Sequence, residues 1–434
     1  MWRAAVRRGT KALGLAFGSV IFFLLLLPVV YMGRRNSAKR VSSPHLVWGD
    51  APIISNPYWA RIMKAAGYCS YSFTDGYCYT INKREDYDRI LADQFPGVPY
   101  EAKKFLGFLW SLLEFDVFFI SFNGFLLGGT PLWRLESYVL RAAGKKVVVM
   151  PFGLDSYIYN RVRSTELLHG LMMSIPAPAR RQGYIGAKVD YWCEKADAVI
   201  PGIMWADGFG RWDALVPSVI SVDESEWDVS KRNSPANGID GVVYIAHAPN
   251  HRGFKGSEFV LEAVRILQAE GVKVELILIE GKQNSEVKRI LREQADILVE
   301  QIICPGHGLN ALEGMASGLT VVCNLENDEY MLPLRRWSYF GECPLVSASP
   351  ENLAEVLRKL IHAPELRQQL GGAGREYIEK YQGATAATFF YGKVIDYLYG
   401  RESSIIQLFH PLHSVRMKEL GKIEHPLINS RLPE

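Results

Sequence analysis

Cysteine and net charge are both scarce in this sequence. Six cysteines occur among 434 residues and no C-x-x-C pair is present, which excludes a disulfide-dense scaffold and leaves structural zinc without support. Lysine and arginine number 49 against 46 acidic residues, so the strongly basic footprint of a nucleic-acid-binding protein is missing. The H-E-x-x-H, Walker and G-x-S-x-G patterns are also absent, which argues against metalloprotease, P-loop and hydrolase chemistry. We therefore expect neither a metal site nor a nucleic-acid partner.

Charge is missing altogether from residues 12–33. At 1.5 Å per residue, these 22 residues reach about 33 Å as a helix, enough to cross a hydrocarbon core of about 30 Å. A cleaved signal peptide normally has a shorter apolar region followed by a small-x-small site, and none is found here. A buried core helix fits poorly, because the run has no polar face. We expect a single-pass membrane anchor that, with a basic, serine-rich linker, occupies residues 1–45.

The orientation of this anchor follows less directly. Four basic residues precede the apolar run and four follow it, so the positive-inside rule does not discriminate. The sequence has no N-x-[ST] glycosylation site and its cysteines show no paired spacing. Both observations favour a catalytic region on the cytoplasmic face. The eight basic residues are Arg3, Arg7, Arg8, Lys11, Arg34, Arg35, Lys39 and Arg40.

From residue 46 onward, short apolar runs alternate with stretches of helical period. This rhythm predicts parallel α/β units in two doubly wound, Rossmann-like domains, over residues 46–229 and 240–400. A polar segment with proline and glycine, residues 230–240, is the expected linker, and residues 401–434 form a tail without clear periodicity. In such sheets ligands bind at the carboxyl ends of the strands, here in the cleft between the domains.

Two segments of the second domain carry the features of an anion site. Residues 304–324 (CPGHGLNALEGMASGLTVVCN) place a glycine-containing turn before a helix, and the free amides near Gly308 and Leu309 suit a phosphate. Glu313, about one turn further on, suits the paired hydroxyls of a ribose. Residues 245–257 (IAHAPNHRGFKGS) place Arg252 and Lys255 just before another helix, where cations and amides would meet a diphosphate together.

These segments resemble the donor site of family-4-like glycosyltransferases with the GT-B fold. The match is firm over residues 240–385 and looser over residues 46–225. It includes Lys255-Gly256 of the phosphate loop and the second glutamate of the E-x7-E motif, Glu313. Two positions differ from the family. Pro305 stands where the motif has its first glutamate, and Asn250 stands where the family has an arginine. Arg252, two positions nearer to Lys255, is a possible replacement for that arginine.

The resemblance implies a fold, an activity and a set of site residues. It implies a membrane-anchored glycosyltransferase, retaining and metal-independent, that uses a nucleotide-sugar as substrate, needs no cofactor and glycosylates a glycan or lipid-linked acceptor in the synthesis of surface polysaccharide or glycoconjugate. The implied donor site comprises Asn250, Arg252, Lys255, Glu280 near the base, Gly308, Leu309 and Glu313.

The catalytic candidates are Asp155 and His247. Asp155 follows a strand in PFGLDSY and suits an acceptor hydroxyl or a base, although an aspartate there also forms turns. His247, like His251, flanks the phosphate loop, where a histidine either contacts a ligand or has a structural role with hydrogen-bond partners inside the protein. Two other functions stay open. A nucleotide-sugar 2-epimerase shares the fold, and a non-catalytic glycan-binding or scaffold protein would explain Pro305.

Overall fold

The computed structural model of the protein describes residues 2–76, 83–203, 207–227 and 234–433. Within them the strands form two sheets, and every pairing between named strands is parallel. The first sheet contains β1 (Leu46–Trp48), β2 (Ser70–Thr74), β3 (Arg89–Ile90), β4 (Val117–Ile120), β5 (Lys146–Val149) and β6 (Ala198–Val199). The second contains β7 (Val243–His247), β8 (Val274–Leu278), β9 (Ile297–Pro305), β10 (Thr320–Asn324) and β11 (Val346–Ser347). The predicted pair of α/β domains is confirmed.

The strand orders locate where each sheet can bind a ligand. The first sheet has the order β3-β2-β1-β4-β5-β6 and the second β11-β10-β9-β7-β8. Both are doubly wound, and the order reverses between β1 and β4 in one sheet and between β7 and β9 in the other. Ligands bind outside the carboxyl ends of the strands at such reversals.

Helices separate the strands, as the alternating pattern predicts. The first domain has α2 (Ser55–Ala65), α3 (Tyr100–Glu114), α4 (Glu136–Ala142), α5 (Thr165–Ser174) and α6 (Gln182–Lys195). The second has α7 (Arg252–Lys255), α8 (Ser257–Ala269), α9 (Asn284–Glu293), α10 (Leu309–Ala316), α11 (Asp328–Trp337), α12 (Leu353–His362), α13 (Pro364–Tyr377) and α14 (Ala384–Leu398). In α8 the predicted apolar face is buried, through Val260, Val264 and Leu267. The first-domain core is rich in aromatic residues, and Trp48 stacks on Phe119 with ring centroids 3.8 Å apart.

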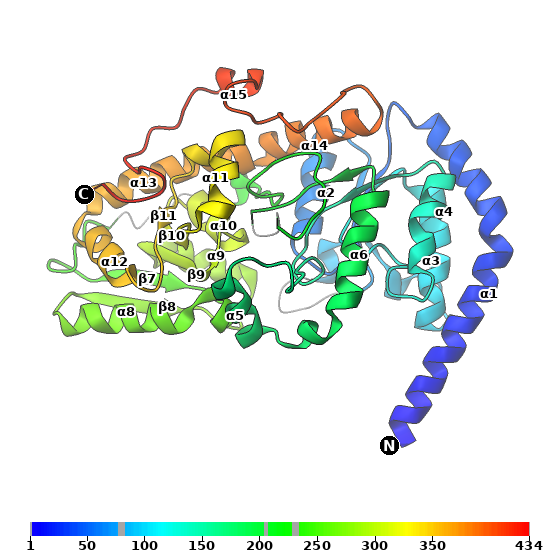
Figure 1. Ribbon diagram of the computed structural model, residues 1–434, viewed down its shortest axis with the longest axis horizontal. Helices are drawn as coiled ribbons and strands as arrows, with labels where there is room; N and C mark the ends of the chain where they lie inside the picture. Colours follow the sequence, from blue (N-terminus) through cyan, green and yellow to red (C-terminus); the bar gives the residue numbers. More distant parts are fainter. Residues whose placement is uncertain (1, 77–82, 204–206, 228–233, 434) are drawn as a thin grey trace.

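The N-terminal helix α1 (Trp2–Lys39) runs along the outside of the first domain beside α3 (Figure 1). Its segment from Lys11 onward is long and apolar enough to cross a membrane, as the sequence predicts. The structure also shows that one face of the helix packs on the first domain. The sequence does not reveal this contact, because the segment is apolar on all sides. Phe22 is fully buried, with its ring centroid 6.0 Å from that of Phe105 on α3.

A buried polar network fastens the C-terminal end of α1. The Ser37 hydroxyl donates to Asp116 at 2.7 Å, and the Lys145 ammonium donates to the Ser37 hydroxyl at 2.7 Å and to Asp116 at 3.3 Å. Burial lowers the pKa of Lys145 to about 8, although the carboxylate of Asp116 acts in the opposite direction. Asp116 and Lys145 directly precede β4 and β5, so the helix end is tied to the start of the sheet.

The last helix of the second domain packs on the first. The Tyr391 hydroxyl of α14 donates to the carbonyl of Val219 at 2.7 Å, and its ring lies 4.8 Å from that of Trp48. The helix α14, which lies within the predicted range 240–400, therefore contacts residues of the predicted range 46–229, and these ranges stay a prediction. Residues 230–233 of the expected linker lie outside the described residues.

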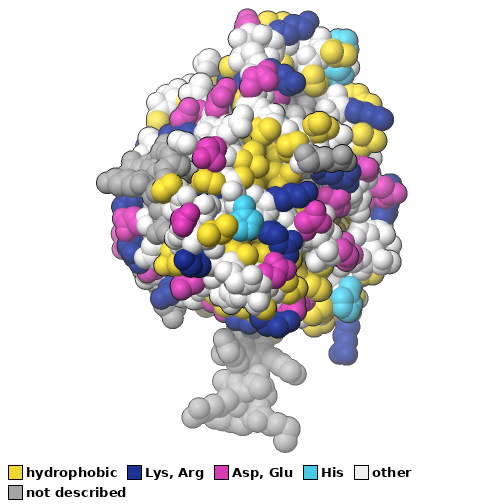
Figure 2. All heavy atoms as spheres, turned by 90° about the vertical axis from the view of Figure 1, so that its left-hand side faces the viewer, with side chains coloured by type: hydrophobic (Ala, Val, Ile, Leu, Met, Phe, Trp, Pro, Cys, Tyr) yellow, Lys and Arg dark blue, Asp and Glu magenta, His cyan; other side chains and the backbone are white. Residues whose placement is uncertain are grey.

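The tail after residue 400 is ordered, although the sequence shows no period there. It includes α15 (Val415–Glu419), buries Ile423, and returns to the second sheet, where the Ser347 amide of β11 donates to the Ser430 carbonyl at 2.7 Å. Figure 2 shows the end of the molecule formed by the second domain, where side chains of both charges are interspersed around an apolar area.

Candidate functional site

A cavity of about 260 Å³ opens at the carboxyl ends of the second sheet. Ile54, from the loop between β1 and α2, lines it from the first domain, so the cavity lies between the domains at the order reversals of both sheets. It brings together four of the predicted donor residues: Asn250, Lys255, Leu309 and Glu313. The full lining is Ile54, Ala248, Asn250, Lys255, Lys282, Asn284, Val287, Glu300, Leu309, Asn310 and Glu313.

Lys255, at the end of α7, meets a carboxylate inside this cavity. Its ammonium donates to Glu300 and, at 2.7 Å, to the Gln301 side-chain oxygen. The second oxygen of Glu300 accepts the Gly308 amide at 3.1 Å, at the start of α10. Glu300 thus accepts hydrogen bonds from the lysine and the helix amide that the sequence assigns to a phosphate. An arriving diphosphate would compete with this carboxylate for both donors.

Gly308 allows this close arrangement because it has no side chain. A Cβ at this position would lie 3.1 Å from Glu300 Oε1 and 3.6 Å from Lys255 Nζ. Such a contact is tighter than most Cβ contacts, so a larger residue would push the charged pair apart.

Glu313, one turn into α10, forms another part of the wall and is buried. Burial raises its pKa to about 7, although a hydrogen bond from the Asn284 amide at 3.3 Å acts in the opposite direction. Both the charged and the neutral form of this carboxyl group can accept hydrogen bonds from hydroxyl groups.

Arg252 and Glu280 are not among the described residues that line the cavity. The Arg252 guanidinium instead forms a two-point ion pair with Glu280, at 2.7 and 2.6 Å, on the exposed surface. Both residues lie near the ends of their elements, as the sequence suggests, but they pair with each other outside the cavity lining.

His247 is fully buried, and both of its ring nitrogens have protein partners. Nδ1 lies 2.8 Å from the carbonyl of Val299, which can only accept, and Nε2 lies 2.8 Å from the Ser257 hydroxyl. Burial lowers the pKa of His247, consistent with a neutral ring that joins β7, β9 and α8. The histidine is not among the described residues that line the cavity.

Asp155 lies at the carboxyl edge of the first sheet, as predicted, but its oxygens are also engaged. They accept the amides of Phe122 at 3.0 Å and Phe152 at 3.1 Å, which ties together the loops after β4 and β5. Burial raises the pKa of Asp155 to about 7, although these amide hydrogen bonds act against it.

Sequence reasoning missed Glu300, Lys282, Asn284 and Asn310. Glu300 is the most informative of them, because it lies within a nine-residue strand that is buried throughout. A lone glutamate inside an apolar run was the available signal, since a buried carboxylate needs a partner. Among the described residues, no group of three or more histidine, cysteine or acidic side chains could hold a metal ion.

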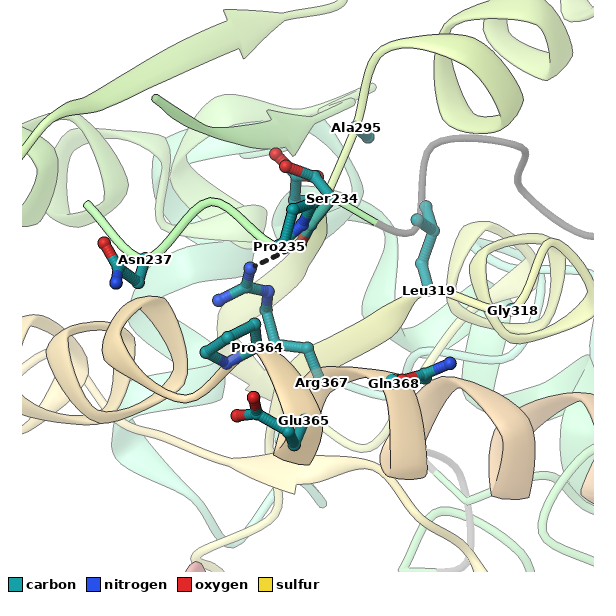
Figure 3. A pocket seen from close by; sticks show the side chains of 11 residues that line it. Ser234, Pro235, Asn237, Ala295, Gly318, Leu319, Pro364, Glu365, Arg367 and Gln368 are labelled. Carbon is teal, nitrogen blue, oxygen red and sulfur yellow. Dashed lines mark hydrogen bonds between the residues drawn. The ribbon is translucent and has the colours of Figure 1, made fainter. Parts of the chain in front are cut away.

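A second cavity of about 290 Å³ lies at the opposite, amino ends of the strands (Figure 3). Its buried Arg367 points toward the chain segment after residue 233 and donates to the carbonyls of Ser234 and Ala236, at 3.2 and 2.6 Å. It also donates to the carbonyls of Leu360 and Ile361, both at 2.7 Å. The guanidinium therefore holds the segment against α12 and α13.

Comparisons with known proteins bear on the fold. No family model and no curated protein matches the chain. Among solved structures, the sucrose-phosphate synthase of Thermosynechococcus elongatus aligns with a TM-score of 0.53 at 15% identity, over 83% of this chain and 100% of that one. The HepE protein of Anabaena, in complex with UDP and glucose, aligns with a TM-score of 0.53 at 11% identity, over 82% and 99%. The chain has the GT-B fold.

A third GT-B structure is an α-glucosyltransferase in complex with UDP and a 13-mer DNA. It aligns with a TM-score of 0.50 at 10% identity, over 81% of this chain and 100% of that one. These structural alignments show the fold alone, and the ligands belong to the proteins in which they were observed.

Proposed function

We propose that this chain is a membrane-attached glycosyltransferase that transfers a sugar from a nucleotide-sugar to a glycan or lipid-linked acceptor. The observation that carries the proposal is the interdomain cavity, where Lys255, the start of α10 and Glu313 meet at the carboxyl ends of the sheet. The GT-B architecture, shared with structures that hold UDP, supports the same conclusion.

In the proposed reaction the bond between the sugar and the diphosphate breaks as the acceptor oxygen bonds to the sugar. Negative charge then grows on the diphosphate, and the Lys255 ammonium and the Gly308 amide would stabilise it. Such preorganised donors are usually a large contribution to catalysis. Glu313 would orient the nucleoside through its ribose hydroxyls, with Asn250 and Lys282 as further polar groups in the same wall.

Several finer features of the proposal rest on the family resemblance. They are retention at the anomeric carbon, independence from metal and a role in making surface polysaccharide or glycoconjugate. A catalytic region on the cytoplasmic face rests instead on the missing N-x-[ST] site and the unpaired spacing of the cysteines. Asp155 and His247 enter the proposal as residues that position the loops around the cleft, because their polar atoms are engaged by the protein itself.

One observation favours a second candidate, a non-catalytic GT-B protein that binds glycan or organises a membrane complex. Glu300 already neutralises Lys255, and the position of the first motif glutamate is Pro305, which ends β9. A binding protein needs neither a free lysine nor that carboxylate.

Nucleotide binding and turnover by the full-length protein in detergent separate these candidates. Calorimetry with a panel of nucleoside diphosphates, followed by donor hydrolysis assays with the matching nucleotide-sugars, gives binding with turnover for the enzyme. Binding without turnover supports the non-catalytic protein, and no binding of any nucleotide overturns both the donor site and the proposed reaction.

A matched pair of variants tests the location of the nucleotide. Glu313→Gln should weaken nucleotide binding, whereas Glu365→Gln in the second cavity should leave it unchanged. Equal effects of the two substitutions would contradict the assignment of the donor site.

A further inference from the structure

The helix α1 contacts the first domain on one side and carries exposed apolar side chains on the opposite side. One face packs on the first domain through residues spaced three or four apart, from Gly14 to Ser37. These 23 intervals span about 35 Å of helix axis. The contact therefore extends along most of the segment that is apolar enough to cross a membrane.

The contact between α1 and α3 is too close to be a loose apposition. A Cβ at Gly18 would lie 2.9 Å from the Cα of Ala102, and a Cβ at Gly33 would lie 2.6 Å from the carbonyl oxygen of Leu112. Between these two glycines, Phe22 is fully buried, with its ring centroid 6.0 Å from that of Phe105 and 6.3 Å from that of Phe108. The two helices run in the same direction, so Gly14 meets the start of α3 and Gly33 meets its end.

The first turns of α3 carry charged residues, and one of them, Glu101, lies beside Gly14 in the apolar stretch of α1. Glu101, Lys103 and Lys104 occupy the first turns of α3, and Glu101 pairs with Lys11 at 3.8 Å. If α1 crossed a bilayer in this position, it would carry these charges and the adjoining domain into hydrocarbon, where charged groups are rare and costly. If it crossed after leaving α3, the face that fits the domain would lose its partner.

The opposite face of α1 is apolar, and none of the described residues covers it. Its side chains include Leu24 and Leu27, 73% and 79% exposed, in a stripe that also contains Leu13, Phe17, Val20, Phe23 and Tyr31. Exposed cations follow this stripe at Arg34, Arg35 and Lys39, and Lys11 precedes it. An apolar stripe with cations at both ends matches the boundary of an anionic phospholipid bilayer, where acyl chains meet headgroups.

We propose that α1 lies flat in the interface of an anionic phospholipid bilayer, remains seated on α3, and attaches the first domain to the membrane without crossing it. A helix in this position usually needs a polar face of its own. Here the domain takes that place, which explains why a helix without polar periodicity can lie in an interface. The inference rests on the membrane attachment in the proposed function and not on sugar transfer.

Spin labels along the exposed stripe test the inclination of α1. Leu13→Cys, Val20→Cys and Leu27→Cys lie seven residues apart and therefore share one face. They are placed in full-length protein, with Cys69 and Cys78 replaced by serine, bound to phosphatidylcholine–phosphatidylglycerol vesicles. A flat helix gives three similar depths from oxygen and nickel-complex accessibility. A crossing helix separates the outer two labels by roughly 21 Å along its axis and would overturn the proposal.

Labelling with a membrane-impermeant maleimide tests the same point independently. Ala12→Cys and the control Ala38→Cys flank the apolar stripe and are both exposed. In sealed vesicles with the domain outside, a flat helix leaves both residues reactive. Protection of Ala12→Cys until detergent is added would overturn the proposal.

Vesicle flotation separates this inference from the rest of the proposed function. A parent protein that fails to float with the vesicles, or that associates with a second copy through α1 instead, also overturns the proposal. Nucleotide binding measured on the same samples reports separately on the donor site, so failure of the membrane geometry and failure of the glycosyltransferase assignment remain distinct.

Discussion

Replacing Glu300 with glutamine removes one negative charge from the cavity and keeps the shape of the side chain. In the parent protein, Lys255 donates to Glu300 and to Gln301, and the Gly308 amide donates to Glu300. A diphosphate competes with that carboxylate for both donors. We therefore expect Glu300→Gln to bind nucleoside diphosphates more tightly than the parent.

The size of the gain follows from one charge-assisted hydrogen bond. Such a bond contributes about 1.5–3 kcal/mol, so freeing Lys255 should lower the dissociation constant by roughly 10- to 150-fold at 1.4 kcal/mol per tenfold. The fold should become less stable at the same time, because Lys255 loses a buried charge partner. That loss should be smaller than the ~3–5 kcal/mol typical of a broken buried pair, since Gln301 and the new amide oxygen still accept from the lysine.

Isothermal titration calorimetry of UDP and other nucleoside diphosphates measures the effect, after circular dichroism and thermal denaturation have established that the variant folds. Glu280→Gln is the matched control, because it removes the carboxylate of an exposed ion pair that contributes little and lies outside the described lining. An unchanged or weaker affinity in folded Glu300→Gln would refute the competition. A gain of the same size in Glu280→Gln would show that net charge alone is responsible.

Three further predictions follow from the contacts of Lys255, from those of α1, and from those of Glu136 on α4, which is fully buried and accepts the amide of Phe125. Lys255→Ala should weaken nucleoside diphosphate binding by roughly 10- to 150-fold, whereas Arg252→Ala should change it by less than about threefold, and equal losses in calorimetry would contradict this. Burial raises the pKa of Glu136 to about 8, so the folded protein keeps a proton that the unfolded chain loses. The free energy of unfolding should therefore fall as pH rises from about 4.5 to 8, by up to about 1.4 kcal/mol per pH unit. Glu136→Gln should show a flatter dependence of melting temperature on pH across this window, and an unchanged slope would contradict the prediction. Gly18→Leu should lower the melting temperature by forcing α1 from α3, at about 1–3 kcal/mol, whereas Ala12→Leu on the exposed face should stay within about 0.5 kcal/mol of the parent.

The fold followed from the sequence because its signals are local and repeated. Several buried strands, such as residues 117–120 and 320–323, are short and mostly apolar runs, and the helices between the strands keep their apolar faces. The packing of α14 on the first domain could not be predicted in this way. Tyr391 looks like any other core aromatic residue, and the identity of its partner depends on how two distant sheets are placed.

The candidate site was predictable to the extent that it depends on helix starts and strand ends. Gly308, Leu309 and Glu313 follow from a turn that opens a helix, and Lys255 from the end of the facing loop. The pairing of Lys255 with Glu300 is a contact across 45 positions, and sequence spacing does not reveal which carboxylate reaches which cation. For the same reason the sequence suggests a phosphate contact for Arg252 but does not reveal its ion pair with Glu280.

The packing of α14 on the first domain affects whether the two domains can be produced as separate fragments. A fragment that ends before the second domain would leave the rings of Trp48 and Trp59 without Tyr391, which packs against both. The complementary fragment would carry that tyrosine, together with Tyr397 and its hydrogen bond to Asp213 at 3.2 Å, on an unpartnered helix. Neither half is a complete folding unit, so separately produced halves should aggregate, and soluble material should require that both be made together and reassociate.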